Sequence, residues 1–385
     1  MIHRVRIQNF KSLRDVTVEL GPVTVFIGKS GTGKTNFAEA IRFLRDCLAL
    51  DVAPAIQKSG PVKCATNPSG ATEFEIEFDV PGAPDRFVYR LALAFVPGPA
   101  EPLCESLSLG GRTVFSQTGA KYIPPPMGVR TQPAWKDCPP LEMPPAPGPL
   151  AIRRLPGVTE AVTAYAALTA GIGVYTFPLG VLSPAGPQRP GGAAPGLADD
   201  ASDYLAAIRD ITTDLNKANV RGTIAATLRR INETVISVDL DSLQNPQTAI
   251  VAHQGPNDKR LTFELRQESE GFRRFYAHLL ALYQTPPKQT LVFEEPENGI
   301  YPGALSLLAD EFKAAPEADR GQVLLTTHSP ALLDHFSDEQ IRVVELADLE
   351  TEIGPLAPEQ RAALREKLLY AGELLTVDPA RRAAP

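Results

Sequence analysis

The chain has 385 residues, which is enough for one to three domains with a buried core. Its 38 Lys and Arg residues against 45 Asp and Glu residues give a net charge of −7, which excludes a globally basic nucleic-acid coat protein. No run of about 18 apolar residues occurs, so we expect no membrane span, and the start lacks the apolar core of a signal peptide. The 4 cysteines have neither metal-clip nor redox-motif spacing, so we expect reduced thiols in a cytoplasmic protein.

The N-terminal part of the chain predicts strands followed by one amphipathic helix. The helix is expected over Lys34–Leu48, where Phe37, Ile41 and Leu44 recur at spacings of three and four residues. Strands are expected where β-branched residues cluster or apolar and polar residues alternate, over Ile2–Ile7, Val16–Leu20, Val23–Ile27, Glu73–Val80 and Arg86–Phe95. The last two strands predict an antiparallel meander.

The middle of the chain is unusually rich in proline. Ten of the thirty residues from Lys121 to Leu150 are proline, and a second Pro/Gly stretch runs from Ser183 to Gly196. Proline lacks the backbone donor and has a fixed φ, so neither stretch can be a regular helix or a central strand. We therefore expect an insert or lid over residues 116–200, with extended connectors.

The C-terminal part predicts alternating helices and strands. Helices are expected over Tyr204–Leu215, Ile224–Ile236 and Pro358–Tyr370, and strands over Gln289–Phe293, Val323–Thr327 and Ile341–Leu346. This alternation predicts an α/β fold in which a sheet packs between helices.

The strongest motif is Gly28-Lys29-Ser30-Gly31-Thr32-Gly33-Lys34-Thr35, which lies between a predicted strand and a predicted helix. Its glycines let successive backbone N–H groups point at phosphate oxygens beside a helix N-terminus. Lys34 is expected to reach the β- and γ-phosphates of a nucleotide, and the Thr35 hydroxyl is expected to bind Mg²⁺.

Two polar strand ends follow much later in the chain. Glu294 and Glu295 directly follow a short apolar strand. We expect the Glu294 carboxylate to face the Mg²⁺ shell and the Glu295 carboxylate to polarise the attacking water. His328 follows another short apolar strand, about one helix crossover after the acidic pair. This spacing favours a histidine that senses the γ-phosphate.

Taken together, these segments resemble the ABC-type AAA-domain ATPases, small bacterial relatives of RecF, SMC proteins and the overcoming-lysogenization-defect nucleases. The resemblance rests on the phosphate loop, on Glu294-Glu295-Pro296-Glu297-Asn298-Gly299 and on Thr327-His328-Ser329-Pro330. Ile7-Gln8-Asn9-Phe10-Lys11-Ser12-Leu13 is similar to the opening of that family, and Ser269-Glu270-Gly271 followed by Arg273-Arg274 resembles its signature segment. The resemblance covers about residues 1–95 and 204–346 and is weak between these ranges.

The resemblance implies a P-loop NTPase fold with an ABC-ATPase-like mixed sheet, an N-terminal antiparallel meander and a proline-rich inserted region. It implies that ATP and Mg²⁺ are bound and that two subunits close head to tail on two ATP molecules. Glu295 would be the general base, and His328 and Lys34 would act on the transferred phosphoryl group. The nucleotide would be bound by Gly28–Thr35 and Asn36 and, in trans, by Ser269, Gly271 and Arg274; Thr35 and Glu294 would hold the metal.

The domain boundaries that we predict follow from these motifs. Residues 1–115 would form the N-terminal half of the ATPase domain and 261–346 its C-terminal half. Residues 116–200 would form the insert, 201–260 a helical region with strands leading to the signature, and 347–385 a C-terminal helix and tail. Lys29, Ser30 and Tyr301 depart from the family pattern, and Gln57 is a candidate for its glutamine loop.

Several functions remain open. We expect an ATP-hydrolysing switch in DNA maintenance or defence against mobile elements, with any nuclease or toxin on a separate effector chain. The alternatives are a non-catalytic ATP-binding scaffold for such an effector and a transporter nucleotide-binding subunit. The Asn9-Phe10-Lys11 opening and the Glu294-Glu295-Pro296 run speak against the transporter. DNA binding is a hypothesis by analogy with RecF and has no support from the net charge.

Overall fold

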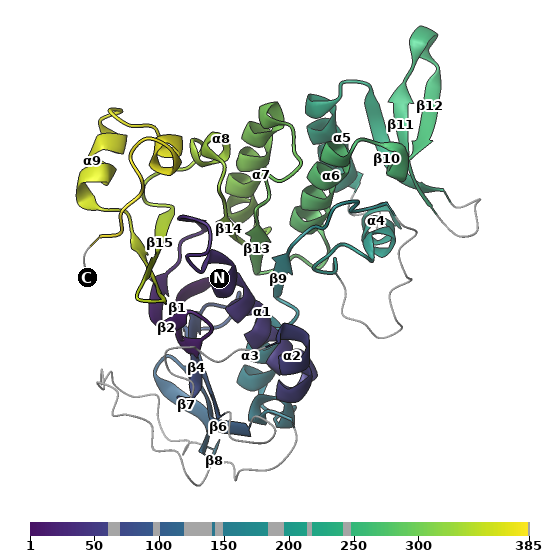
Figure 1. Cartoon of the computed structure of the whole chain (residues 1–385). Helices are drawn as coiled ribbons and strands as arrows, with labels where there is room; N and C mark the ends of the chain where they lie inside the picture. Colours follow the sequence, from purple (N-terminus) through teal and green to yellow (C-terminus); the bar gives the residue numbers. More distant parts are fainter. Residues whose placement is uncertain are drawn as a thin grey trace.

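The computed structural model describes residues 1–60, 70–94, 101–118, 141–142, 149–183, 196–213, 218–241 and 248–383. These ranges form two large sheets with helices around them and a small projecting sheet (Figure 1). Cys64, Cys138 and most of the two proline-rich stretches lie outside them. Within the described ranges, no helix is long and apolar enough to cross a membrane.

The N-terminal residues form a seven-stranded sheet in the order β2-β1-β4-β5-β6-β7-β8. Neighbours from β2 through β7 are antiparallel, which confirms the N-terminal meander. Burial alternates along β4, where Phe74, Ile76 and Phe78 face the core. The strands are β1 (Ile2–Phe10), β2 (Leu13–Glu19), β4 (Thr72–Phe78), β5 (Phe87–Ala94), β6 (Glu101–Leu109), β7 (Arg112–Thr118) and β8 (Leu141–Glu142).

The second sheet has six strands in the order β16-β15-β3-β14-β13-β9 and is mixed. Its strands from β15 to β9 run parallel, and β16 is antiparallel to β15. The carboxyl ends of the parallel strands therefore meet at one edge of the sheet, where ligands bind in open α/β folds. The strands are β3 (Val23–Ile27), β9 (Ile172–Tyr175), β13 (Thr290–Glu294), β14 (Gln322–Thr326), β15 (Ile341–Ala347) and β16 (Glu350–Pro355).

The parallel strands are buried on both faces. In β3, Val23, Val25 and Ile27 pack into one hydrophobic cluster with α6 and α7, while Phe26 packs into a second cluster with α1 and the seven-stranded sheet. The helices are α1 (Lys34–Leu50), α2 (Val52–Ser59), α3 (Thr159–Leu168), α4 (Tyr204–Thr213), α5 (Ala218–Ile231), α6 (Glu270–Tyr283), α7 (Leu305–Glu317), α8 (Pro330–Leu333) and α9 (Pro358–Arg365). Short 3₁₀ turns span Ala151–Arg154, Pro256–Asp258, Leu265–Gln267, Pro302–Ala304 and Ala371–Leu375.

A third sheet joins β10 (Val235–Asp241), β11 (Thr248–Gln254) and β12 (Arg260–Glu264) in an antiparallel order. It projects from the body of the molecule at the upper right of Figure 1. The chain passes from β12 through one 3₁₀ turn directly into α6.

The structure differs from the predicted elements in three places. The helix expected over Ile224–Ile236 ends at Ile231, because Asn232 accepts hydrogen bonds from the N–H and hydroxyl of Thr234 and turns the chain into β10. The helix expected over Pro358–Tyr370 ends at Arg365. Part of segment 116–200, for which we expected an insert or lid, lies in the core: β9 pairs with β13, and α3 packs in the second cluster.

Candidate active site

The phosphate loop joins the carboxyl end of β3 to the first turn of α1, and its path depends on glycine. The φ angles of Gly31 and Gly33 are +80° and +104°, a region that residues with a Cβ rarely adopt. A Cβ on Gly33 would also lie 2.1 Å from Oγ1 of Thr351 in β16. Glycine is therefore required at position 33 for two independent reasons.

A small network of polar side chains stabilises the phosphate loop through hydrogen bonds. The Thr351 hydroxyl donates to the backbone oxygen of Thr32 at 2.8 Å and lies 2.6 Å from the hydroxyl of Ser12. Nδ2 of Asn36, which we predicted to bind nucleotide, donates to the Ser12 hydroxyl at 2.7 Å. The opening turn and the β15–β16 hairpin, which are far apart in sequence, thus hold the loop together.

The Lys34 side chain is buried inside its own loop. Its Nζ donates to the backbone oxygens of Gly28 and Lys29, both at 2.8 Å. Burial lowers the pKa of Lys34 to about 8, against a smaller upward effect of the Glu295 and Glu297 carboxylates. The ammonium therefore sits where arriving phosphate oxygens would replace backbone acceptors and add negative charge.

The other loop residues differ in exposure. Thr32 is buried, and its hydroxyl donates to the backbone oxygen of Lys29 at 2.9 Å. Lys29, Ser30, Gly31 and Thr35 are exposed, so a ligand can reach these residues.

Glu295 and His328 face each other at the adjoining ends of β13 and β14. Oε1 of Glu295 lies 3.7 Å from Nε2 of His328, which is longer than a direct hydrogen bond. Glu295 has a φ of +45°, an uncommon conformation that is held by a hydrogen bond from its N–H to the Thr326 carbonyl at 3.1 Å. Partial burial and the Lys34 charge lower the pKa of His328, so the imidazole is neutral near pH 7.

Glu294 lies at the end of β13 with its side chain 9% exposed. Its Oε1 is 3.0 Å from Nη2 of Arg42 and accepts a hydrogen bond from the Thr176 hydroxyl at 2.8 Å. Glu294 and Thr35 line one groove, and a hydroxyl with a carboxylate oxygen is a donor pair that suits Mg²⁺. The side chains predicted to hold the metal therefore fit it.

Residues of the phosphate loop line two separate grooves. One, of about 770 Å³, runs from Gly28–Thr32 and His328 to the C-terminal segment around Leu374–Arg381. The other, of about 740 Å³, is the Thr35 and Glu294 groove, which Arg42, Arg45 and Asp199 also line. His328 thus lines one groove, and the side chains predicted to hold the metal line the other.

The signature segment begins α6. Ser269 is the N-cap of this helix, and its exposed hydroxyl accepts from the N–H of Phe272 at 3.2 Å. A Cβ on Gly271 would lie 3.0 Å from the backbone oxygen of Gly299, so the start of α6 packs closely on the turn after the acidic strand. Ser269 is available to a second molecule at this helix end.

Arg274, the third predicted residue of the signature, is buried and faces its own chain. Its Nε donates to Glu270 at 3.0 Å and its Nη1 to the Phe177 backbone oxygen at 3.1 Å. Gly299, with a φ of +73°, lies directly against its side chain. Arg274 therefore joins α6 to the turn of the acidic strand, and these bonds occupy two of its donor groups.

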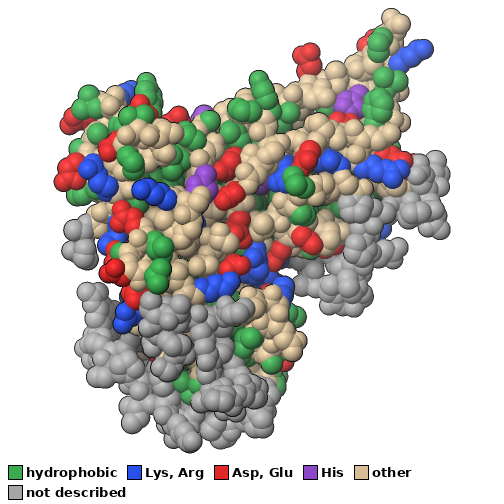
Figure 2. Space-filling model, in the orientation of Figure 1, with side chains coloured by type: hydrophobic (Ala, Val, Ile, Leu, Met, Phe, Trp, Pro, Cys, Tyr) green, Lys and Arg blue, Asp and Glu red, His purple; other side chains and the backbone are tan. Residues whose placement is uncertain are grey.

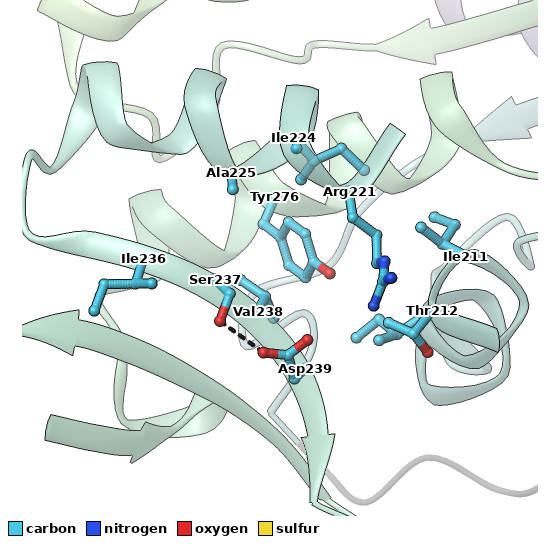
Figure 3. Close-up of a pocket in the computed structure, with 12 residues that line it drawn as sticks. Ile211, Thr212, Arg221, Ile224, Ala225, Ile236, Ser237, Val238, Asp239 and Tyr276 are labelled. Carbon is cyan, nitrogen blue, oxygen red and sulfur yellow. Dashed lines mark hydrogen bonds between the residues drawn. The ribbon is translucent and has the colours of Figure 1, made fainter. Parts of the chain in front are cut away.

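A smaller cavity of about 240 Å³ lies away from the loop, between α4, α5, α6 and β10. In Figure 3 the side chains of Tyr276 and Arg221 point into it, opposite the hydrogen-bonded pair Ser237 and Asp239. Isoleucine and valine side chains form much of its wall. Without a glycine loop or a row of backbone donors, it does not suit a triphosphate.

Charge on the molecular face drawn in Figure 2 is mixed. Lys and Arg side chains alternate there with Asp and Glu side chains over the described residues. This face gives no large field of one sign that would attract a nucleic-acid backbone.

Sequence reasoning missed several residues of the site. Glu297 belongs to a motif that we quoted but received no role, although it contacts the His328 backbone. Arg42 follows Thr35 by seven residues, a helical spacing that could have placed both on one face. Thr176 and Thr351 carry no local sequence signal, since only the fold brings them to the loop and the acidic strand.

Two family models and one curated protein match parts of this chain. Residues 158–334 match a family model described as "AAA domain, putative AbiEii toxin, Type IV TA system", and residues 1–80 match one described as "AAA ATPase domain". Over 83 residues the chain is 32% identical to an OLD nuclease of Thermus scotoductus. That match spans 21% of this chain and only 15% of the nuclease.

Solved SMC head structures share the fold. An SMC head bound to the C-terminal winged-helix domain of ScpA aligns with a TM-score of 0.56 at 17% identity, over 94% of this chain and 99% of that chain. A head from Pyrococcus furiosus, with an extended coiled coil and the C-terminal domain of ScpA, aligns with a TM-score of 0.52 at 13% identity, over 96% and 99%. At this identity the similarity is one of fold alone.

Proposed function

We propose that this chain, whose residues 1–80 and 158–334 match AAA ATPase family models, binds Mg·ATP and hydrolyses it as a nucleotide-driven dimer switch. One observation carries the proposal. The phosphate loop, the Glu294-Glu295 pair and His328 lie at the carboxyl ends of adjacent parallel strands β3, β13 and β14. These three segments are far apart in the sequence, so their meeting is a property of the fold.

Each residue has a definite task in this reaction. Lys34 binds the β- and γ-phosphates, and its charge stabilises the negative charge of the transition state. Glu295 accepts the proton of the water whose oxygen attacks the γ-phosphorus, while the bond to the ADP oxygen breaks. His328, opposite Glu295, contacts the transferred phosphoryl group.

The metal end of the site is formed by the Thr35 hydroxyl and the Glu294 carboxylate. Mg²⁺, when bound, neutralises charge on the β- and γ-phosphates. Glu294 is mostly buried and is held by two neighbours, so it can keep its orientation while nucleotides exchange.

The exposed position of Ser269 supports the proposed dimer. This residue is exposed at the N-terminus of α6, where backbone N–H groups favour an anion. In a head-to-tail pair, Ser269 and Gly271 of one subunit would approach the γ-phosphate held by the loop of the other. ATP would then join the two subunits, and hydrolysis would release them.

The biological setting is proposed from the named relatives. SMC heads are solved with ScpA, one family model is described as a putative toxin, and the curated relative is a nuclease. We place the switch in DNA maintenance or in defence against mobile elements, where a separate effector chain reads the closed dimer.

The test is mass by light scattering together with phosphate release, on wild type, Glu295→Gln and Lys34→Ala, with and without Mg·ATP. We expect ATP to convert wild type partly to a dimer, Glu295→Gln to trap that dimer without releasing phosphate, and Lys34→Ala to stay monomeric. A mass that ignores ATP in all three proteins would refute the dimer switch. If ATP dimerises both wild type and Glu295→Gln but neither protein releases phosphate, the result would favour the non-catalytic scaffold.

A further inference from the structure

Arg42, Thr176 and Glu294 form a closed triangle beside the phosphate loop. Nη2 of Arg42 lies 3.0 Å from Oε1 of Glu294 and donates to the Thr176 hydroxyl at 2.9 Å, and that hydroxyl donates to the same Oε1 at 2.8 Å. Arg42 and Thr176 therefore both bind the same oxygen of Glu294, Oε1. Among the described residues, Oε2 of Glu294 has no hydrogen bond or ion pair.

The three corners of the triangle come from three parts of the chain. Arg42 lies in α1, seven residues after Thr35 and three after Glu39, so the three share one helix face. Thr176 directly follows the edge strand β9, and Glu294 ends β13, the neighbour of β9. Thr35, Arg42, Thr176 and Glu294 all line the groove of about 740 Å³.

Arg42 is itself held in place. Its Nε lies 3.6 Å from Oδ2 of Asp199, and its side chain is 20% exposed. Asp199 is fixed by two hydrogen bonds from Arg45, both at 2.7 Å, and this pairing lowers the pKa of the Asp199 carboxyl despite its burial. The guanidinium is thus oriented before any ligand arrives.

This arrangement has a consequence for the metal. A free glutamate can turn either oxygen toward a cation, which costs side-chain entropy when the cation binds. Here Oε1 is occupied twice, so Oε2 is the oxygen left for the metal or its water shell. Partners that orient a metal-binding carboxylate commonly change metal affinity when they are removed.

We propose that Arg42 and Thr176 are positioning residues of the metal end of the site, which hold Oε1 of Glu294 so that Oε2 serves Mg²⁺ together with Thr35. The inference rests on the proposed function, because it assumes that this groove takes Mg·ATP. It adds that metal use depends on an arginine of α1 and on the residue that follows β9.

The test compares the affinity for a fluorescent ATP analogue in EDTA and in Mg²⁺, for wild type, Arg42→Gln, Thr176→Val and Thr176→Ser. The dissociation constant in EDTA divided by the dissociation constant in Mg²⁺ reports the contribution of the metal to binding, and it needs no turnover. We expect this ratio to fall about 10-fold in Arg42→Gln and Thr176→Val, with affinity in EDTA unchanged. Thr176→Ser keeps the hydroxyl and should match wild type.

Lys58→Gln is the matched control for the loss of one positive charge. Lys58 lines the same groove, but it pairs with Asp46 at 2.7 Å and not with Glu294. Its ratio should equal that of wild type. If it falls as far as that of Arg42→Gln, the groove acts through its total charge, and the positioning role is wrong.

Two further results separate the proposals. Wild type that binds no tighter than Lys34→Ala would refute ATP binding, and with it this inference. Normal Mg²⁺-dependent binding by wild type with unchanged ratios in Arg42→Gln and Thr176→Val would refute the positioning role alone. Equal weakening in EDTA and in Mg²⁺ would also refute it, because the triangle would then support the loop and not the metal.

Discussion

The carboxylate of Glu297 holds the backbone of His328: Oε1 accepts the His328 N–H at 2.8 Å. The same oxygen accepts the hydroxyl of Thr327 at 2.7 Å. The turn after the acidic strand β13 is thereby joined to the end of β14. This junction sets the position of the imidazole relative to Glu295.

Removal of this carboxylate should impair hydrolysis more than nucleotide binding. In Glu297→Ala, the His328 segment loses both bonds, and we expect phosphate release to fall about 10-fold, as for a lost charge-assisted contact. Glu297→Gln keeps a carbonyl oxygen that can accept both bonds, so most of the rate should return. The measurement is steady-state phosphate release with the affinity for Mg·ATP determined in parallel.

A different outcome would assign Glu297 another role. If Glu297→Gln is as slow as Glu297→Ala, the negative charge near Lys34 and His328 matters and the anchoring bond does not.

Two glycine positions of the loop should differ sharply in tolerance. Gly33→Ala would combine a φ of +104° with a Cβ 2.1 Å from Thr351, so we expect a loss of about 2–4 kcal/mol in the free energy of unfolding or a displaced loop that no longer binds ATP. Gly31 has a φ of +80°, but a Cβ added there would meet nothing within 4 Å, so Gly31→Ala should cost only about 1 kcal/mol. Urea unfolding of both variants checks this, and equal losses would contradict the steric argument.

Nucleotide binding should take up protons above pH 8. The pKa of Lys34 is about 8 in the free protein, because the ammonium is buried, and phosphate anions would raise it. At pH 8.5 binding should therefore take up about three-quarters of a proton, and affinity should fall as the pH rises further. Calorimetry of Mg·ATP binding in two buffers of different ionisation enthalpy measures the uptake.

The same titration at pH 7 is the control, since Lys34 is already mostly protonated there. Uptake that is absent at both pH values would mean that the ammonium keeps its ordinary pKa in the free loop.

The buried His278 should make stability depend on pH. Burial lowers its pKa to about 4, while the unfolded chain has a value near 6.5. As the pH falls below 6.5, the unfolded state takes up the proton first, so the folded state loses stability, and the loss levels off below about pH 4. Between pH 7 and pH 5 this side chain should contribute a loss of about 2 kcal/mol.

His278→Gln removes the titrating group at similar size and provides the comparison. Urea unfolding at pH 7 and pH 5 should show a smaller decrease for the variant than for wild type. Equal decreases would assign the pH dependence to other groups.

Most residues of the candidate site could be predicted because they lie in contiguous motifs. The loop Gly28–Thr35 needs its glycines and lysine next to one another, and the acidic pair and His328 each end a short apolar strand. Such local patterns specify both the residue types and the strand or helix that carries them. The fold class followed from the same alternation of strands and helices.

The sequence by itself determined which residues we propose for the phosphate chemistry, since each motif is local. Only the tertiary structure decided what holds them: Thr351 on the loop, Glu297 on His328, and Arg42 with Thr176 on Glu294. Only the tertiary structure also revealed β9, which we did not predict because it lies near the proline-rich stretches. This strand pairs with β13 at the edge of the sheet. These contacts join residues that are far apart in the chain, and their energies depend on a packed sheet that no local pattern encodes.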